Sequence, residues 1–155
     1  MKDKNCAYCM REENPALYQK FGYPVCEMDS GFLYLFREQS HPGRMILAYH
    51  DHADDIAEIS AEERARFFDD AAEIARVMHK LYAPKKINFG MYGDTGHHLH
   101  IHIVPKYEGE FEFGGTFAMD PGKFYQTEEK LAEMAEAVRK ELGKKFLSGR
   151  RTPLR

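Results

Sequence analysis

Residues 98–104 read His-Leu-His-Ile-His-Ile-Val, so that three histidines alternate with aliphatic residues. This period of two is typical of a β-strand with one buried face. On such a strand the three imidazoles point to one face, roughly 7 Å apart, and the aliphatic side chains point to the other, where they can pack into a core. Imidazole can ligate a metal, attack an electrophile or transfer a proton near neutral pH. The segment therefore predicts a half-buried strand whose polar face binds a metal or handles a phosphate.

Length and composition favour one soluble domain. The chain has 155 residues, of which 43% are hydrophobic and 30% charged, and its net charge is −3. This charge gives no sign of a nucleic-acid or membrane-surface partner. The N-terminus has no apolar segment typical of a signal peptide, and no run approaches the ~20 apolar residues of a membrane span. We therefore expect a cytoplasmic protein with no membrane and no nucleic-acid partner.

Three cysteines argue against a disulfide framework, because their number is odd. In a reducing cytoplasm the pair Cys6-x-x-Cys9 is more often metal-binding or redox-active than a structural bridge. Cys26 has no obvious partner and is expected to be a small buried hydrophobic residue.

The rest of the chain reads as strands and helices in an antiparallel arrangement. Turn residues separate three candidate strands, and a Ser60/Glu63 capping box starts a long helix that Pro84 ends. The candidate strands are Val25–Met28, Phe32–Arg37, Arg44–His50, 86–92 and 98–104. We expect a long loop over 105–126, rich in glycine and aromatic residues, which either covers a ligand, docks on the body or fills a subunit interface. A C-terminal helix over 127–146 and a loose basic tail over 147–155 complete the prediction.

The alternating histidines match the signature H-φ-H-φ-H-φ-φ, where φ is apolar, and the chain thereby resembles the histidine-triad (HIT) superfamily. The resemblance extends from Cys6 to about Pro105 and includes the order of elements. It implies an α+β, HIT-like fold: an antiparallel sheet of about five strands with one long helix and a C-terminal helix, forming a single domain over residues 1–155. Relatives are commonly homodimers whose sheets join, so we expect a homodimer.

The resemblance also implies nucleotide chemistry at phosphorus. In that family the middle histidine, here His100, attacks the α-phosphate of a nucleotide conjugate, and water then releases a nucleoside monophosphate. Such a nucleophile needs a neutral imidazole whose other nitrogen is held by an acceptor. His102 would stabilise charge on the phosphate oxygens. The expected substrates are small nucleotides such as phosphoramidates or dinucleoside polyphosphates.

Family members often read Gly-Gln-Ser/Thr before the triad, where this chain has Gly93, Asp94 and Thr95. Thr95 and Asp94 are both candidate nucleotide contacts. Thr95 could bind a phosphate oxygen or the leaving group, whereas a carboxylate at Asp94 would repel phosphate unless it is protonated or turned away. Asn88 is a further candidate phosphate contact, and Glu38 a candidate for the ribose hydroxyls. Arg44 replaces a histidine found in many relatives, and it either reaches an anionic substrate group or is an ordinary surface residue.

Some HIT proteins carry a zinc site built from an N-terminal C-x-x-C, a histidine after the meander and the first triad histidine. This likeness implies the ligands Cys6, Cys9, His52 and His98 and a structural zinc ion with no open position. His50 is the competitor of His52, and a redox role of the cysteines is the alternative to metal binding. Three other functions stay open: a nucleotidyltransferase using the same intermediate, a non-enzymatic nucleotide-binding module, and a metal site that uses the whole histidine row.

Overall fold

Five antiparallel strands form one sheet in the computed structural model, which describes residues 2–146. Their order across the sheet is β1-β2-β3-β5-β4. The bounds are β1 Gly22–Glu27, β2 Gly31–Phe36, β3 Met45–Tyr49, β4 Lys86–Gly90 and β5 His100–Lys106. The expected α+β fold with a five-stranded antiparallel sheet is confirmed, and the first three strands form the predicted meander. The predicted basic tail over 147–155 lies outside the described residues.

The histidine strand begins two residues later than the alternation predicts. Regular pairing between β3 and β5 stops at Ala48 and His100. Beyond it, the Leu99 carbonyl accepts from the Tyr49 amide at 2.9 Å, but the Leu99 amide donates to Ala53 at 2.6 Å. The backbone therefore leaves the ladder here, because its partner changes from β3 to the loop that follows β3. His98 lies in this irregular segment, just ahead of the strand.

The long helix, α2, runs over Ala61–Tyr82 and begins as its sequence predicts. The Ser60 hydroxyl accepts from the Glu63 amide at 3.2 Å, and the Glu63 carboxylate accepts from the Ser60 amide at 2.8 Å. The helix ends at Ala83, whose φ of 48° lies in the left-handed region, directly before Pro84. The other helices are α1 Ala16–Gln19, η1 Ile56–Glu58 and α3 Glu128–Phe146. None of the helices within residues 2–146 is both long and apolar enough to span a bilayer.

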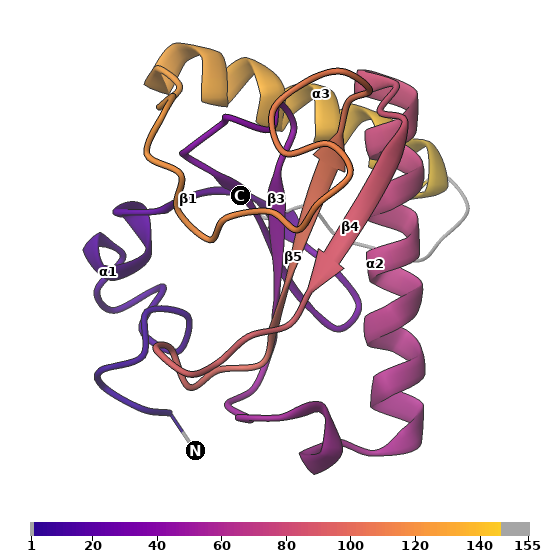
Figure 1. Ribbon diagram of the computed structural model, residues 1–155. Coiled ribbons are helices and arrows are strands. Elements are labelled where there is room, and N and C mark those ends of the chain that lie inside the picture. The colour runs from indigo at the N-terminus through magenta and orange to yellow at the C-terminus, as the bar shows by residue number, and fades with distance from the viewer. Residues whose placement is uncertain (1, 147–155) are drawn as a thin grey trace.

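The two faces of the sheet are covered differently, as Figure 1 shows. Helices α2 and α3 lie on one face and bury the main apolar core, which includes Leu33, Leu47, Ile101 and Ile103. The N-terminal segment and α1 lie on the other face, where a second, aromatic cluster forms. Since His100 and His102 alternate with the core residues Ile101 and Ile103, they point toward this second face.

The connection between β5 and α3 begins at Tyr107, two residues later than the predicted loop, because β5 continues to Lys106. We call residues 107–127 the aromatic loop. It runs back beside the sheet and forms an isolated bridge between Tyr125 and Glu38, past the end of β2. The segment therefore lies close to the turn that joins β2 to β3.

Candidate functional site

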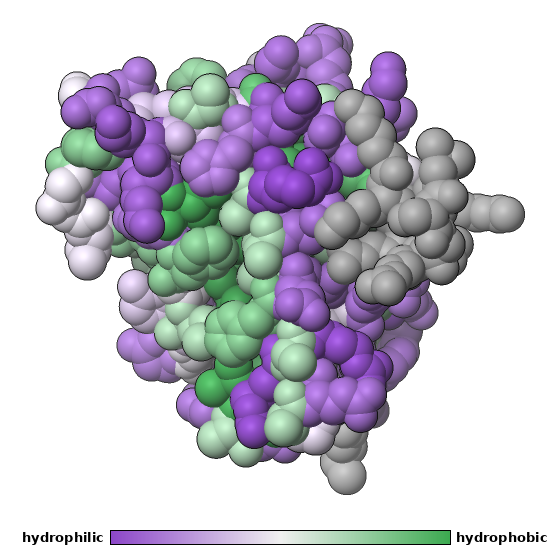
Figure 2. Space-filling view, turned by 90° about the vertical axis from the view of Figure 1, so that its right-hand side faces the viewer, coloured by the Kyte–Doolittle hydropathy of each residue, from purple (hydrophilic) through white to green (hydrophobic). Residues whose placement is uncertain are grey.

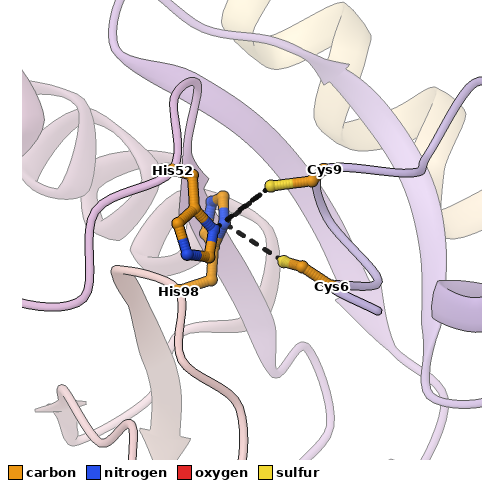
Figure 3. Close-up of side chains that lie close together, drawn as sticks. All are labelled: Cys6, Cys9, His52 and His98. Carbon is orange, nitrogen blue, oxygen red and sulfur yellow. Dashed lines mark hydrogen bonds between the residues drawn. The ribbon is translucent and has the colours of Figure 1, made fainter. Parts of the chain in front are cut away.

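A cysteine–histidine cluster lies where the N-terminal segment meets the end of the sheet. Cys6 and Cys9 point toward His52 and His98, which come from the segments after β3 and before β5 (Figure 3). The Cys6 Sγ–His98 Nδ1 and Cys9 Sγ–His52 Nδ1 distances are both 3.3 Å, and one ligand atom from each of the four residues lies within 4.8 Å of the others. The four side chains could hold a metal ion. His50 is exposed and pairs with Asp51 instead.

The outer nitrogens of both cluster histidines meet oxygen atoms. His98 Nε2 donates to the Tyr49 carbonyl at 2.8 Å, and His52 Nε2 lies 3.7 Å from a carboxylate oxygen of Asp54. The hydrogen bond to Tyr49 fixes His98 in the tautomer whose Nδ1 lone pair faces the cluster. Burial lowers the pKa of His98 to about 4, which keeps its imidazole neutral and able to ligate. Burial raises the pKa of the Cys6 thiol, so a bound cation is needed to favour its thiolate.

His100 is held in the orientation that a nucleophilic imidazole requires. Its Nδ1–H donates to the backbone carbonyl of His98 at 2.6 Å, which leaves the lone pair on Nε2. Burial lowers the pKa of His100, so the ring is neutral at physiological pH. The Tyr8 ring, which lies between the two cysteines in sequence, packs on both His98 and His100, with ring centroids 5.1 and 5.5 Å away.

His102 is the neighbour of His100 on the same strand face, with ring centroids 5.0 Å apart. Arg44 Nη2 donates to His102 Nδ1 at 3.1 Å. Burial, together with the charge of Arg44, lowers the pKa of His102 to about 3. The ring is therefore a neutral imidazole over the whole physiological range.

Arg44 reaches His102 because the Gln39 side chain stabilises the turn between β2 and β3 that positions Arg44. The Gln39 side chain accepts from the Gly43 amide at 2.7 Å and donates to the carbonyls of Phe36 and Arg44 at 2.5 and 3.1 Å. Gly43 has a φ of 97°, a backbone conformation that favours glycine. Arg44 is 0% exposed, so the interpretation of this residue as an ordinary surface side chain is wrong.

The aromatic loop is anchored beside this pair. The Lys106 ammonium, 2% exposed, donates to the carbonyls of Glu112 and Gly115. Glu112 accepts from His41 Nε2 at 2.7 Å and from the Ala118 amide at 3.0 Å. These bonds place Phe117 next to His102, with ring centroids 6.2 Å apart. The loop thereby forms one wall of the histidine site.

The histidine row lies within the segment that matches a known family model. The HIT domain model matches residues 26–109, more than half of the chain and the part that contains the histidine row. The chain belongs to the HIT family.

Solved structures with this HIT fold share little sequence with the chain. A histidine triad protein from Marinobacter aquaeolei is 20% identical, with a TM-score of 0.74 over 81% of this chain and 92% of that chain. A Zn-bound histidine triad family protein from Mycobacterium smegmatis is 18% identical, with a TM-score of 0.59 over 81% and 86% of the two chains. Plasmodium falciparum diadenosine triphosphate hydrolase is 17% identical, with a TM-score of 0.63 over 81% and 84%. At these identities the likeness establishes the fold.

Not every predicted site residue of this HIT protein lies beside the histidines. Asp94 and Thr95 lie on an exposed turn, whereas Asn88 is half-buried in β4 and, paired with Val104 of β5, lies on the sheet face of His102. Glu38 is 1% exposed, and its carboxylate accepts from Ser40 and from the Phe124 amide. Its predicted role toward ribose therefore depends on access past the aromatic loop.

Three contributors to the site are missing from the sequence-based list: Tyr8, Phe117 and the contact of Arg44 with His102. The position of Tyr8 between the two cysteines is a signal that could have identified it. Residues within a C-x-x-C turn necessarily lie close to the site that the two sulfurs form. Phe117 has no such signal, since its place depends on the path of a 21-residue loop.

Proposed function

We propose that this HIT protein is a nucleotide hydrolase that acts at the α-phosphate of nucleoside 5′-phosphate conjugates. One observation carries the proposal: the His98 carbonyl holds His100 as a neutral imidazole with its lone pair on Nε2. That is the state in which imidazole attacks phosphorus, and it needs no separate base to remove a proton.

The proposed reaction has two steps. His100 Nε2 attacks the α-phosphorus, a nitrogen–phosphorus bond forms, and the bond from phosphorus to the leaving group breaks, with a proton from solvent water going to that group. Water then attacks phosphorus, the nitrogen–phosphorus bond breaks, and the nucleoside monophosphate leaves. His102 donates a hydrogen bond to a phosphate oxygen as charge develops there.

The nucleotide contacts are proposed residue by residue. Thr95 and Asn88 are the phosphate contacts, and Glu38 is the ribose contact. Asp94 is exposed, so its carboxylate can turn into solvent and away from a bound phosphate. The fold likeness to a diadenosine triphosphate hydrolase supports dinucleoside polyphosphates as one substrate class beside phosphoramidates.

We further propose that the cluster of Cys6, Cys9, His52 and His98 holds a structural zinc ion. In a tetrahedral site with zinc–sulfur bonds of about 2.3 Å and zinc–nitrogen bonds of about 2.0 Å, sulfur and nitrogen lie ~3.5 Å apart. The 3.3 Å separations of the two closest sulfur–nitrogen pairs fit this spacing. Four protein ligands leave no open position, so zinc would tie the N-terminal segment to the sheet rather than activate water.

A homodimer joined along β4 is also proposed. Strand β4 is an edge of the sheet and carries Phe89, 52% exposed, while Phe68 on α2 is 48% exposed. Figure 2 shows a strip of apolar surface on the side of the molecule where α2 lies. Sedimentation velocity of the wild type and of Phe89→Lys tests this assembly, and a monomeric wild type would contradict it.

The hydrolase proposal is tested with an adenosine phosphoramidate and the variant His100→Ala, which should lose roughly a thousand-fold or more in kcat/KM. The matched control is His97→Ala, because His97 is exposed and adjacent to the row. Mass spectrometry of the quenched wild type should find the nucleotidyl group on His100.

The outcomes of this experiment separate the competing functions. Nucleotide binding without turnover by the wild type would replace the hydrolase with a binding module. Transfer of the nucleotidyl group to added phosphate in preference to water would make the protein a transferase. Equal turnover by His100→Ala and wild type would overturn the assignment of the nucleophile.

A further inference from the structure

We propose that Arg44 is a positioning residue that fixes His102 as the Nε2–H tautomer and so makes it a permanent hydrogen-bond donor. The tautomer is inferred only from contacts between residues of this chain. Its use toward a phosphate oxygen rests on the proposed function.

The partner of His102 Nδ1 decides which ring nitrogen carries the proton. A guanidinium group has five N–H donors and no acceptor. Because Arg44 Nη2 lies 3.1 Å from His102 Nδ1, Nδ1 must accept the hydrogen bond with its lone pair. In a neutral imidazole the single proton is then on Nε2, which is turned away from Arg44.

Arg44 is held in place by contacts on several sides. Its guanidinium donates to the carbonyls of Ala118 and Met119 at 3.2 and 2.8 Å. It also stacks on Phe36, 4.1 Å from the ring centroid, and lies 5.1 Å from that of Phe117. Groups of both the sheet and the aromatic loop thus contact the guanidinium, and together they restrict it to one orientation.

Arg44 keeps its positive charge beside His102. Burial lowers the pKa of Arg44 to about 10, so the group is still cationic at neutral pH. Among residues 2–143, no carboxylate lies within 4.0 Å of it, although Glu38, Asp120 and Glu112 act on it from farther away. A buried cation that no contacting anion neutralises opposes a second proton on His102. The titratable and charged groups that act on His102 are Arg44, from the start of β3, and His100, from β5.

The two adjacent rings therefore have complementary states. The His98 carbonyl leaves His100 with a lone pair on Nε2, whereas Arg44 leaves His102 with a proton on Nε2. One ring can attack phosphorus, and the other can donate to an oxygen on that phosphorus. Because His102 resists gaining or losing a proton, it is a fixed donor rather than a general acid, and the leaving group must take its proton from another source.

The tautomer is tested by NMR of the full chain labelled with nitrogen-15 in its histidines and without any nucleotide. His102, assigned by comparison with His102→Asn, should show an unprotonated Nδ1 and a protonated Nε2, and this pattern should persist well below pH 6. Arg44→Met removes the donors at similar length, so His102 should become a mixture of tautomers and titrate at higher pH. Arg44→Lys restores one donor and should recover the pattern in part.

Two results would overturn the proposal: a proton on Nδ1 of His102 in the wild type, or the same tautomer and titration in Arg44→Met as in the wild type. The wild-type spectrum decides the first even if the variant does not fold. Since no substrate is used, failure here leaves the hydrolase proposal standing. In turn, a confirmed tautomer in a chain without turnover would contradict only the hydrolase. With turnover established, Arg44→Met should lose roughly ten- to a hundred-fold in kcat with little change in KM.

Discussion

Each histidine of the alternating row has a different partner at Nδ1. Cysteine sulfur faces His98, a backbone carbonyl accepts from His100, and a guanidinium donates to His102. Three side chains of one type, spaced two residues apart, are thereby given three chemical states. These states follow from the atom that each ring meets, because an imidazole adjusts its proton to its partner.

The low pKa of His102 predicts a loss of stability in acid. Its pKa is about 3 in the folded chain, against roughly 6.5 for an unperturbed histidine. Between these two values the unfolded chain binds a proton here that the folded chain does not, so the free energy of unfolding falls as the pH falls. This one group accounts for up to about 1.4 kcal/mol per pH unit. Urea denaturation of the wild type between pH 7 and pH 4 measures the slope.

The matched variant is His102→Asn, which lacks the titrating group. Its free energy of unfolding should fall less steeply than that of the wild type over the same pH interval. Loss of a bound metal in acid affects both proteins and cancels in the comparison. Parallel curves for the two proteins would show that His102 is not held neutral in the folded state.

The sequence predicts the histidine row but not the tautomer and protonation state of each imidazole. The alternation placed His100 and His102 on one face because β-strand geometry alone decides this. The guanidinium partner of His102 could not be predicted, since Arg44 lies 58 residues away in sequence and reaches the ring from a turn that Gln39 braces. The burial of Glu38, whose carboxylate accepts from the Phe124 amide, could not be predicted either, because no local sequence pattern specifies the path of a long loop.

Glu112 makes several of the bonds that hold the aromatic loop, beside those made by Lys106 and Arg44. Its carboxylate joins His41 to the Ala118 amide, and its backbone has a φ of 59°, in the left-handed region. Replacing Glu112 with Ala should free the segment around Ala118. Trypsin cleavage at Lys123 should then accelerate several-fold under native conditions, because proteolysis follows the population of the open segment.

The control for this prediction is Glu110→Ala, which removes an exposed carboxylate of the same loop. Its cleavage rate should match that of the wild type. An unchanged rate for Glu112→Ala would mean that Lys106 and Arg44 hold the loop without help from Glu112.

Helices and strands were predicted where local chemistry specifies them. The capping box fixed the start of α2 at Ala61, and turn residues separated the strands of the meander. The predicted end of β5 at Val104 is two residues too early, because Pro105 and Lys106 are residue types that are common in loops. Lys106 is nevertheless buried, with its ammonium satisfied by two carbonyls of the loop that follows.

The N-terminal segment joins the rest of the molecule through the cysteine–histidine cluster. The variant Cys6→Ser should lose the metal, which is expected at about one zinc per wild-type chain. A lower melting temperature should accompany this loss, because a ligand that binds only the folded state stabilises it. Elemental analysis and calorimetry measure the two effects, and hydrogen exchange should increase in residues 3–21.

Cys26→Ser is the matched control, since Cys26 is a buried cysteine outside the cluster. It should retain the metal. Zinc content that Cys6→Ser leaves unchanged would disprove the proposed ligand set. Some turnover should survive in Cys6→Ser, because His100 and His102 are still present.

His98 serves two centres with two different parts of one residue. Its imidazole faces the sulfurs, and its carbonyl accepts from His100. An ion that orders the side chain therefore also orders the peptide group that aims the nucleophile. If the cluster holds the proposed zinc ion, removal of the ion should loosen this peptide group and so lower, without abolishing, the rate at which His100 is nucleotidylated.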